Sequence, residues 1–503
     1  MSTLTTTDPR TGAATSTGIE PTSAAEVGAL ASAAAEAFRA LRAYPRVWRA
    51  GLLRALADAL EERRVELVET AMAETGLAEA RLNTELTRSA FQFRLFADAV
   101  DEGGYLEAII DHAASTPMGP GPDVRRMLVP IGPIAVFGSS NFPFAFSVVG
   151  GDTASALAAG NPVVIKAHSS HPLTSQRSFS ALADAAAAYG APAHTLGIVY
   201  GQAAGAALVA DPAIAAVGFT GSLSTGRILQ EIIDQRETPI PFFGELSSLN
   251  PLIVTPDAAS ARADAIADGL FTSFTGSAGQ LCTKPGIAFL PAEAGGIVDA
   301  IVARAQDAAP QALLNSRILG AFDEIRERLI DDGKARSLVA PHTGADGFTL
   351  SPAVLEIDAA DVTAAVAEEA FGPLIVIARY REVDEVRIAL EAIPGSLTAT
   401  IHGEASESDL VATLASEVQD LVGRIVYNGY PTGVRVSWGM HHGGPWPATN
   451  TQHTSVGISA IRRFLRPLAW QDAPEAVLPE ELRDGAADVP RRVDGVLELA
   501  ASA

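Results

Sequence analysis

The chain has one cysteine, Cys282, and it is the first candidate for chemistry. It lies in Gly279-Gln-Leu-Cys-Thr283, a turn of small residues followed by Lys284-Pro-Gly286. A thiolate is a good nucleophile where electropositive surroundings lower the pKa of the thiol. Most lone cysteines are inert core residues, and the turn context is what favours a nucleophile here. A single cysteine allows no intramolecular disulfide and no thiolate cluster for zinc or iron–sulfur.

Two other polar residues follow strand-like apolar segments. Glu245 ends the segment 239–245, where burial is expected to raise the pKa of the carboxyl and make it a general base. The alternative is a strand-end charge that turns into solvent. Asn141 lies in Gly138-Ser-Ser-Asn-Phe-Pro-Phe144, where its amide can donate to a developing oxyanion, or can serve only as a turn residue.

Basic residues and glycines supply the next candidates. Of 36 basic residues only Lys166, Lys284 and Lys334 are lysines, which indicates positions where a compact ammonium fits better than a planar guanidinium. Gly221-Ser-Leu-Ser-Thr-Gly226 follows a strand-like segment and opens a helix, so its backbone N–H groups can meet a pyrophosphate. The sequence contains neither a Gly-x-Gly-x-x-Gly fingerprint nor a P-loop.

Histidines give no metal site in this reading. The chain has nine, and the pairs His441-His442 and His168/His171 lack sequence neighbours that would complete a ligand set. We therefore predict that no metal is bound.

The elements that must position these residues are predicted as two α/β domains. Residues 24–113 have a helical repeat, and short apolar strands separated by helices follow. The first set of strands is Ile131–Phe137, Pro162–Ile165, Leu196–Val199, Ala215–Phe219 and Ile240–Phe243. The second set is Asn250–Val254, Gly286–Leu290, Pro373–Ala378, Leu397–His402 and Arg424–Asn428. The strand spacing is typical of parallel sheets, and the tail after Gly444 is predicted as an extended arm rather than a packed unit.

Composition limits the classes of partner. The net charge of −23 argues against nucleic acid and anionic membranes, since both require a basic surface. No apolar run is long enough to span a membrane, and residues 1–28 do not have the pattern of a secretory signal. We expect a cytoplasmic protein that acts on a small molecule.

Six separated motifs together resemble the aldehyde dehydrogenase superfamily. They are Asn141-Phe-Pro, Asn161-Pro-Val-Val-Ile-Lys166, Phe219-Thr-Gly-Ser222, Glu245-Leu, Gly279-Gln-x-Cys282 and Glu369-Ala-Phe-Gly-Pro373. Four further segments resemble the branch that contains 2,5-dioxopentanoate (α-ketoglutarate semialdehyde) dehydrogenases and bacterial NADP-dependent fatty aldehyde dehydrogenases. These are Asn428-Gly-Tyr-Pro-Thr-Gly433, His442-Gly-Gly-Pro445, Thr454-Ser-Val-Gly457 and Arg462-Arg-Phe-Leu-Arg-Pro467.

The resemblance implies a fold and a reaction. The fold would be α/β, with two Rossmann-type parallel-sheet domains and a small oligomerisation arm. Residues 1–111 and 131–247 would form the dinucleotide-binding domain, 248–446 the catalytic domain, and 112–130 with 447–503 the arm and tail. Cys282 would attack an aldehyde, Asn141 would hold the oxyanion, and Glu245 would activate the water that hydrolyses the thioester. The aldehyde would be 2,5-dioxopentanoate or, alternatively, a medium- or long-chain aldehyde.

The same resemblance assigns the cofactor and its contacts. Lys166 and Glu369 would bind the two riboses of NAD or NADP, and Phe371 would lie near the nicotinamide ribose. Gly221, Ser222 and Gly226 would follow the pyrophosphate. Ser169 stands where NAD-preferring members often have a glutamate, which favours NADP because a carboxylate would repel the 2′-phosphate. Ser247-Ser248 replaces the usual Gly-Gly after Glu245-Leu.

Three questions stay open at the level of sequence. Lys284 can lower the pKa of Cys282, can pair with the distal carboxylate of a dioxo-acid substrate, or can point into solvent. A cofactor-free cysteine hydrolase of the nitrilase type also needs Cys, Glu and Lys, but it would leave 221–226 and 369–373 without a role. The family resemblance implies a homodimer or homotetramer, without deciding between them.

Overall fold

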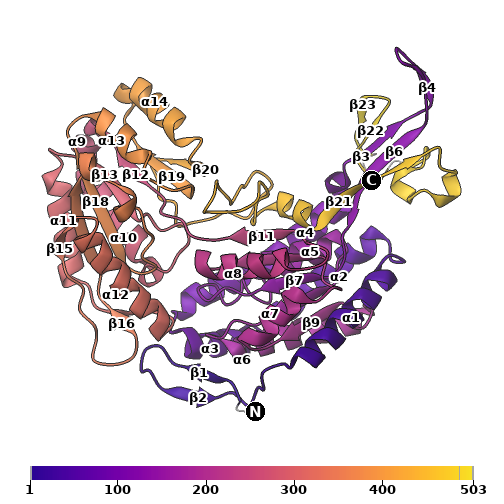
Figure 1. Ribbon diagram of the computed structural model, residues 1–503, viewed down its shortest axis with the longest axis horizontal. Helices are drawn as coiled ribbons and strands as arrows, with labels where there is room; N and C mark the ends of the chain where they lie inside the picture. The colour runs from indigo at the N-terminus through magenta and orange to yellow at the C-terminus, as the bar shows by residue number, and fades with distance from the viewer. Residues whose placement is uncertain (1–2, 487, 501–503) are drawn as a thin grey trace.

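The computed structural model describes residues 3–486 and 488–500. Two lobes lie side by side, and an arm projects from one of them (Figure 1). A hairpin of β1 (Thr5–Thr7) and β2 (Ala14–Ser16) lies near the N-terminus at the edge of the molecule.

The first lobe contains a five-stranded parallel sheet in the order β11-β10-β7-β8-β9. Its strands are β7 (Ile134–Phe137), β8 (Val163–Lys166), β9 (Leu196–Val199), β10 (Ala216–Thr220) and β11 (Phe242–Glu245). Its helices are α1 (Ala24–Leu41), α2 (Arg46–Glu62), α3 (Arg64–Thr75), α4 (Glu79–Glu102), α5 (Gly151–Ala159), α6 (Pro172–Tyr189), α7 (Gln202–Ala210) and α8 (Leu223–Asp234). All five strands predicted for this domain are present.

The second lobe contains a seven-stranded sheet in the order β15-β17-β18-β13-β12-β19-β20, parallel except for β15. Its strands are β12 (Leu252–Val254), β13 (Ile287–Pro291), β15 (Arg336–Val339), β17 (Ala353–Asp358), β18 (Leu374–Tyr380), β19 (Ser396–His402) and β20 (Val422–Tyr427). Its helices are α9 (Pro256–Ala261), α10 (Ala263–Thr275), α11 (Gly295–Asp307), α12 (Ser316–Asp331), α13 (Val383–Leu390) and α14 (Ser408–Val418). Strands β14 (Gln311–Ala312) and β16 (Thr349–Leu350) form a separate pair.

The arm contains a five-stranded, mostly antiparallel sheet in the order β21-β6-β3-β22-β23. Its strands are β3 (Ala108–Asp111), β6 (Val124–Pro130), β21 (Leu465–Gln471), β22 (Arg491–Val493) and β23 (Val496–Glu498), and the hairpin of β4 (Ala114–Thr116) and β5 (Gly119–Gly121) extends from it. Strand β3 pairs within this sheet although the predicted arm begins at residue 112.

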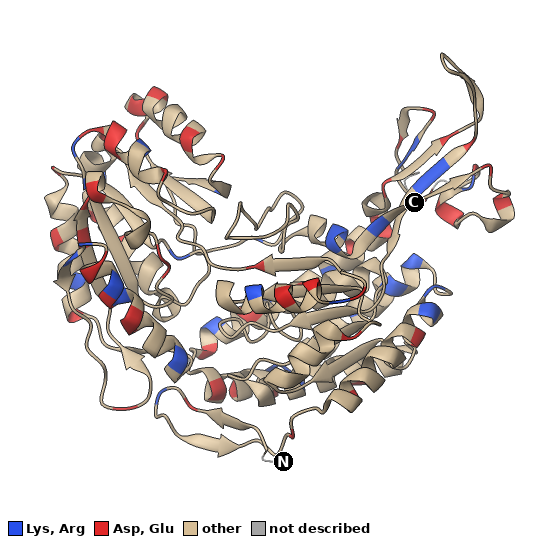
Figure 2. Ribbon diagram, in the orientation of Figure 1, with Lys and Arg blue, Asp and Glu red and all other residues tan. Residues whose placement is uncertain are grey.

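Burial explains why these segments become parallel strands. Every residue of β7 and of β13 is buried, which requires helices on both faces of the sheet and matches the continuous apolar runs in the sequence. Charged residues lie mostly on helices and on the arm, while the central strands carry few (Figure 2). Among residues 3–486 and 488–500, none of the helices combines the length and apolar character needed to cross a lipid bilayer.

The segment after Gly444 packs more closely than predicted. The backbone of Leu246 donates to the carbonyl of Ala448, and Thr449 forms a β-bridge with Glu245. The 3₁₀ helix η6 (Ile458–Phe464) buries Phe464 in the core of the first lobe, and β21 pairs with β6 along its whole length. The prediction of an extended arm rather than a packed unit is therefore wrong for residues 445–464, because their apolar side chains complete the core.

Candidate active site

The loop that carries Cys282 has an unusual backbone. In the 3₁₀ segment η2 (Gly276–Gly279), Ser277, Ala278 and Gly279 have φ of 56°, 54° and 67°. A side chain at Gly279 would overlap the carbonyl of Gly372, so glycine is required there and the loop touches the segment that follows Glu369. Glycine therefore lets the loop turn sharply just before the thiol.

Asn250 fixes the other side of this loop. Its Nδ2 donates to the carbonyl of Cys282 at 2.8 Å and to that of Lys284 at 3.0 Å. Its backbone is left-handed, with φ of 56°, and its side chain is buried. Asparagine tolerates this conformation better than most residues, so it can both turn the chain and hold the cysteine loop.

Cys282, His442, Glu245 and Ser455 form one contact chain. The Cys282 Sγ lies 3.6 Å from Nε2 of His442, and the same nitrogen lies 3.0 Å from Oε1 of Glu245. The other carboxylate oxygen, Oε2, accepts from the Ser455 hydroxyl at 2.7 Å. His442, Glu245 and Ser455 are buried, while Cys282 keeps partial exposure. The thiol is thus the reactive group that a small molecule can reach.

The charge state of Glu245 differs from the prediction. Burial by itself raises the pKa of this carboxyl, but the charge and hydrogen bond of His442, with hydrogen bonds from Ser455 and Cys282, lower it to about 2. The expected raised pKa is therefore wrong, because these partners are distant from Glu245 in sequence. An ionised carboxylate only accepts hydrogen bonds, so Nε2 of His442 must carry the hydrogen between them.

The pKa of Cys282 is raised. Burial contributes most, followed by the negative charge of Glu245 and a hydrogen bond to it, and Glu369 adds to the effect, while Arg88 opposes it. The thiol is therefore protonated at neutral pH and needs a base before it can attack. Both Glu245 and His442 are close enough to influence that proton transfer.

His442 and Ser455 are the functional candidates that sequence reasoning missed. The prediction that His442 lacks partners is wrong, since one ligand atom each of Glu245, Cys282 and His442 lie within 4.8 Å of one another. The segments His442-Gly-Gly-Pro445 and Thr454-Ser-Val-Gly457 contained the signal, but they were interpreted only as branch motifs. Thr454 accepts from the backbone of His442 at 2.8 Å, which ties the two segments together.

Asn141 lies beside the cysteine loop. Its Nδ2 donates to the carbonyl of Gln280 at 3.0 Å, and its own carbonyl accepts from Arg81 at 2.6 Å. The side chain is 8% exposed. The amide nitrogen is thus held two residues from Cys282, and its second hydrogen is not used in this contact.

Lys284 is buried and Glu369 is half-buried, and Lys284 contacts the segment after Glu369. The Nζ of Lys284 donates to the carbonyls of Ala370 and Leu374, both at 3.0 Å, and the residue is 2% exposed. The solvent-facing alternative is therefore wrong, and these contacts tie the loop to the segment after Glu369. Burial lowers the pKa of Lys284 to about 8, against the opposing charge of Glu369. The substrate role of Lys284 stays a prediction.

Ser247-Ser248 has a direct contact with the predicted ribose ligand. Oε2 of Glu369 accepts from the Ser247 hydroxyl at 2.6 Å and from the Ser248 backbone at 2.9 Å. Burial raises the pKa of Glu369, and these hydrogen bonds oppose the rise. Glycine at position 247 would leave this carboxylate without the hydroxyl.

Comparison with known proteins decides the family. The model of the aldehyde dehydrogenase family matches residues 2–445. The chain is 43% identical to alpha-ketoglutaric semialdehyde dehydrogenase 2 of Azospirillum brasilense over 94% of this chain and 92% of the relative. It is 38% identical to alpha-ketoglutaric semialdehyde dehydrogenase of Acinetobacter baylyi, covering 94% and 91%. The chain belongs to the aldehyde dehydrogenase family.

The solved structures agree with this assignment. An NADP complex of NADP-dependent glyceraldehyde-3-phosphate dehydrogenase from Bacillus halodurans superimposes with a TM-score of 0.77 at 25% identity, covering 93% of this chain and 96% of that one. The predicted fold class is confirmed. The protein is an oxidoreductase that uses NAD(P), and membership of the family excludes the cofactor-free hydrolase.

Five of the residues predicted to hold the dinucleotide end or follow strands of the first sheet, whereas Glu369 and Phe371 precede β18 of the second. Lys166 ends β8, Ser169 is exposed three residues later, and Gly221 follows β10. The Gly221 backbone donates to the carbonyl of Glu245 at 3.0 Å, which links this edge to the cysteine centre. In a parallel sheet, ligands bind beyond these strand ends.

The helix after β10 is suited to a phosphate group. Ser222 caps α8, its hydroxyl accepting from the Thr225 backbone at 3.3 Å. A side chain at Gly226 would collide with Leu246, so only glycine lets the helix approach this closely. The exposed N-terminal turn offers backbone N–H donors, and these residues fit a pyrophosphate. Phe371 is half-buried after Glu369.

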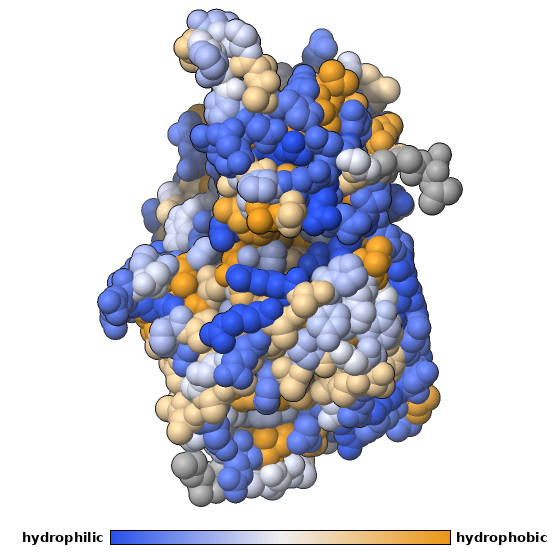
Figure 3. All heavy atoms as spheres, turned by 90° about the vertical axis from the view of Figure 1, so that its right-hand side faces the viewer, coloured by the Kyte–Doolittle hydropathy of each residue, from blue (hydrophilic) through white to orange (hydrophobic). Residues whose placement is uncertain are grey.

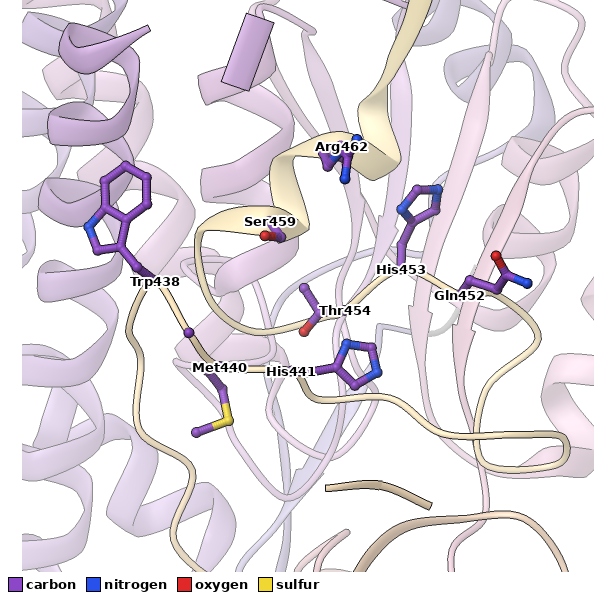
Figure 4. Close-up of a pocket in the computed structure, with 9 residues that line it drawn as sticks. Trp438, Met440, His441, Gln452, His453, Thr454, Ser459 and Arg462 are labelled. Carbon is purple, nitrogen blue, oxygen red and sulfur yellow. The ribbon is translucent and has the colours of Figure 1, made fainter. Parts of the chain in front are cut away.

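A cavity of about 260 Å³ lies among the C-terminal segments that carry His441 and Thr454 (Figure 4). It is lined by Trp438, Gly439, Met440, His441, Gln452, His453, Thr454, Ser459 and Arg462. His441 and Thr454 border it, while their neighbours His442 and Ser455 point to Glu245. Adjacent residues of the segments 441–442 and 454–455 thus face the cavity and Glu245, respectively.

Proposed function

We propose that the protein oxidises 2,5-dioxopentanoate to 2-oxoglutarate with NAD(P), through a covalent intermediate on Cys282. The observation that carries the reaction type is the contact chain of Cys282, His442 and Glu245, in a member of this family. The substrate is proposed from the two alpha-ketoglutaric semialdehyde dehydrogenases, each of which aligns with more than nine-tenths of the chain.

The first step is attack of the thiol on the aldehyde carbon. The proton leaves Sγ for solvent, which the partial exposure of Cys282 allows, and Glu245 stays ionised beside the His442 N–H. A carbon–sulfur bond forms and the carbonyl oxygen becomes an oxyanion. The Asn141 amide and the backbone N–H of Cys282 donate to that oxygen, as preorganised donors in a partly buried site.

The second half of the reaction removes a hydride and then adds water. NAD(P), when bound, supplies the hydride acceptor. The thioester left on Cys282 is hydrolysed by a water that Glu245 deprotonates. The carboxylate product leaves, and Sγ recovers its proton. Overall the aldehyde and water give a carboxylate, a reduced dinucleotide and protons.

For the cofactor we propose a preference for NADP. Ser169 has no charge to repel a 2′-phosphate. Burial lowers the pKa of Lys166 to about 8, and the positive charge of Arg317 adds to this, so a second cation lies close to this edge. Lys166 and Glu369 are proposed to contact the two riboses, with Gly221, Ser222 and Gly226 beside the pyrophosphate and Phe371 near the nicotinamide ribose.

A homodimer or homotetramer is proposed on the basis of the arm. Large apolar residues are exposed there, namely Met118, Val477, Val496, Leu497 and Leu499. Orange apolar patches lie among blue residues in the upper half of the face that carries the arm (Figure 3). Exposed apolar surface of this kind is typical of subunit contacts. A cytoplasmic location is proposed from the sequence pattern of residues 1–28, which is not that of a secretory signal.

A steady-state panel tests the proposal. The rate of absorbance increase at 340 nm is measured with 2,5-dioxopentanoate, pentanal and decanal, each with NAD and NADP. We expect the highest kcat/KM with 2,5-dioxopentanoate and NADP. A higher kcat/KM with decanal would instead assign the protein to medium- or long-chain aldehydes.

A further inference from the structure

An anionic substrate creates a requirement that Cys282, Glu245 and Asn141 do not meet. 2,5-Dioxopentanoate carries a carboxylate, and four C–C bonds of ~1.5 Å place it ~5 Å from the aldehyde carbon. The chain has a net charge of −23, so its overall field repels an anion. Glu245 adds a buried negative charge at the site. A local cation is therefore needed near the thiol.

One face of α4 carries such cations. Arg81, Glu85 and Arg88 recur at i, i+4 and i+7, and so share the face that packs against the segment 141–146. Oε1 of Glu85 accepts from the backbones of Phe144 and Ala145 at 2.8 and 3.0 Å. Two guanidinium groups thus face one carboxylate, which leaves an excess of positive charge on this face.

Arg88 differs from other arginines in its hydrogen bonds. Its Nε and Nη2 are both shielded from solvent and have no partner among residues 3–486 and 488–500. Within those residues no other arginine has two such nitrogens. Arg424, whose pKa also responds to the charge of Cys282, donates instead through Nη1 and Nη2 to the carbonyls of Gly433 and Pro431. Unpaired buried donors are costly, so two on one side chain need an explanation.

These two nitrogens form the edge of a guanidinium that binds a carboxylate side-on. The chain itself contains the pattern, because Nε and Nη2 of Arg125 donate to the two oxygens of Asp123, both at 3.0 Å. Arg10 binds Asp8 in the same way, again with both distances at 3.0 Å. Arg88 presents the same edge without a carboxylate from the described chain.

Arg88 lies near the cysteine centre, with the rings of Phe146 and His442 between its guanidinium and the thiol. Its guanidinium lies 5.1 Å from the ring centre of Phe146, and the Phe146 and His442 ring centres are 6.2 Å apart. The charge of Glu245, and that of Cys282 once the thiol ionises, act on Arg88. In the opposite direction, Arg88 lowers the pKa of the Cys282 thiol. The residue as a whole is half-buried, but Nε and Nη2 are shielded, so a carboxylate reaches them only when the side chain or the rings beside it move.

From this geometry we propose that Nε and Nη2 of Arg88 bind the carboxylate of the substrate, and that this contact selects aldehydes with an acid group at the other end. The inference rests on the proposed function, since it names the residue that recognises the dioxo-acid. The rings of Phe142 and Phe146 cover the guanidinium and exclude water from the ion pair.

The test compares Arg88→Met, which keeps the stem and removes the charge, with Arg94→Met on the same helix. Arg94 is partly exposed and pairs with Asp58, so its loss changes the chain charge equally without reaching the site. For Arg88→Met we expect KM for 2,5-dioxopentanoate to rise at least tenfold, equivalent to ~1.4 kcal/mol, with KM for pentanal within about twofold. Arg94→Met should leave both KM values unchanged.

A second measurement does not depend on turnover. 2-Oxopentanoate has the same acid end but no aldehyde, so it should protect Cys282 from iodoacetamide. The concentration needed for protection should rise at least tenfold in Arg88→Met, again ~1.4 kcal/mol, and part of the loss should return in Arg88→Lys. The Lys variant also provides a folded protein if Met at this buried position unfolds the helix.

The outcomes separate the two proposals. If wild type prefers pentanal to 2,5-dioxopentanoate, the proposed function fails before any variant is made. If wild type prefers the dioxo-acid but both KM values rise together in Arg88→Met, or protection is unchanged, Arg88 does not bind the carboxylate. An equal fall in the alkylation rate for all ligands, with its pH profile moved to higher pH, would show that Arg88 acts only on the pKa of Cys282.

Discussion

Two parts of the site are assembled in opposite ways. The cofactor edge is the carboxyl end of the first sheet, where the dinucleotide is proposed to bind. The cysteine centre is the cluster of Cys282, His442, Glu245 and Ser455. Lys166, Ser169 and Ser222 follow strands of a single parallel sheet, each within three residues of a strand end. The cysteine centre is gathered from segments far apart in the chain, with Glu245 on β11, Cys282 after η2, and His442 from the C-terminal segment. The cofactor edge can be predicted from the local sequence pattern of strands and turns. The cysteine centre exists only once both lobes and the C-terminal segment have packed together.

The largest expected effect is at the thiol. Cys282→Ala removes the nucleophile but no part of the first sheet, so turnover should fall by at least ~10³-fold. Binding of NADPH, followed by its fluorescence, should stay at the wild-type Kd, which sharpens the separation between the two regions. Residual turnover above a few per cent would contradict the covalent route.

Glu245→Gln tests the second half of the reaction. The amide keeps the shape of the side chain but cannot deprotonate water, so hydrolysis of the thioester should slow by ~10²–10⁴-fold. A rapid-mixing experiment should give a burst of about one NAD(P)H per site, followed by a slow phase. Loss of the burst would mean that Glu245 is needed first to take the proton of Cys282.

His442→Ala removes the partner that lowers the pKa of Glu245. Burial then acts with less opposition and the pKa of the carboxyl rises, so the carboxylate is lost at a higher pH as the solution is acidified. The acidic limb of the kcat profile should move to higher pH, with a fall of ~10–100-fold near neutral pH. His441→Ala is the control, since that ring borders the cavity of Figure 4. An unmoved limb would assign it to another group.

The last expected effect is at the cofactor edge, and it concerns cofactor preference rather than turnover. Ser169→Glu places a carboxylate where a 2′-phosphate is proposed to lie, and should shift the NADP-to-NAD ratio of kcat/KM by about 5–150-fold toward NAD. Ser115→Glu, an exposed position in the arm strand β4, makes the same charge change far from this edge. A ratio that moves equally in both variants would exclude a local contact.

The sequence predicted most of the fold and only part of the site. All ten strands proposed for the two sheets are present, because continuous apolar runs flanked by helices leave few alternatives. Cys282, Glu245 and Asn141 were found from motifs. The structure places the side chains of Glu245 and Asn141 beside the loop that carries Cys282. The pKa of Glu245 was predicted in the wrong direction, because His442 and Ser455 lie about 200 residues away in sequence. Arg88 could not be found either, since an arginine on an amphipathic helix usually faces solvent.

Burial of Lys284 also determines how the chain responds to amine reagents. Its ammonium is enclosed by two carbonyls, whereas Lys334 is exposed after α12 and Lys166 is half-buried. Since the pKa of Lys166 is about 8, it is deprotonated more readily than an ordinary lysine. An amine-reactive fluorescent ester should therefore label Lys166 in the first lobe and Lys334 in the second, and leave Lys284 unlabelled. Protection of Lys166 by a dinucleotide would report cofactor occupancy, with Lys334 as the internal standard.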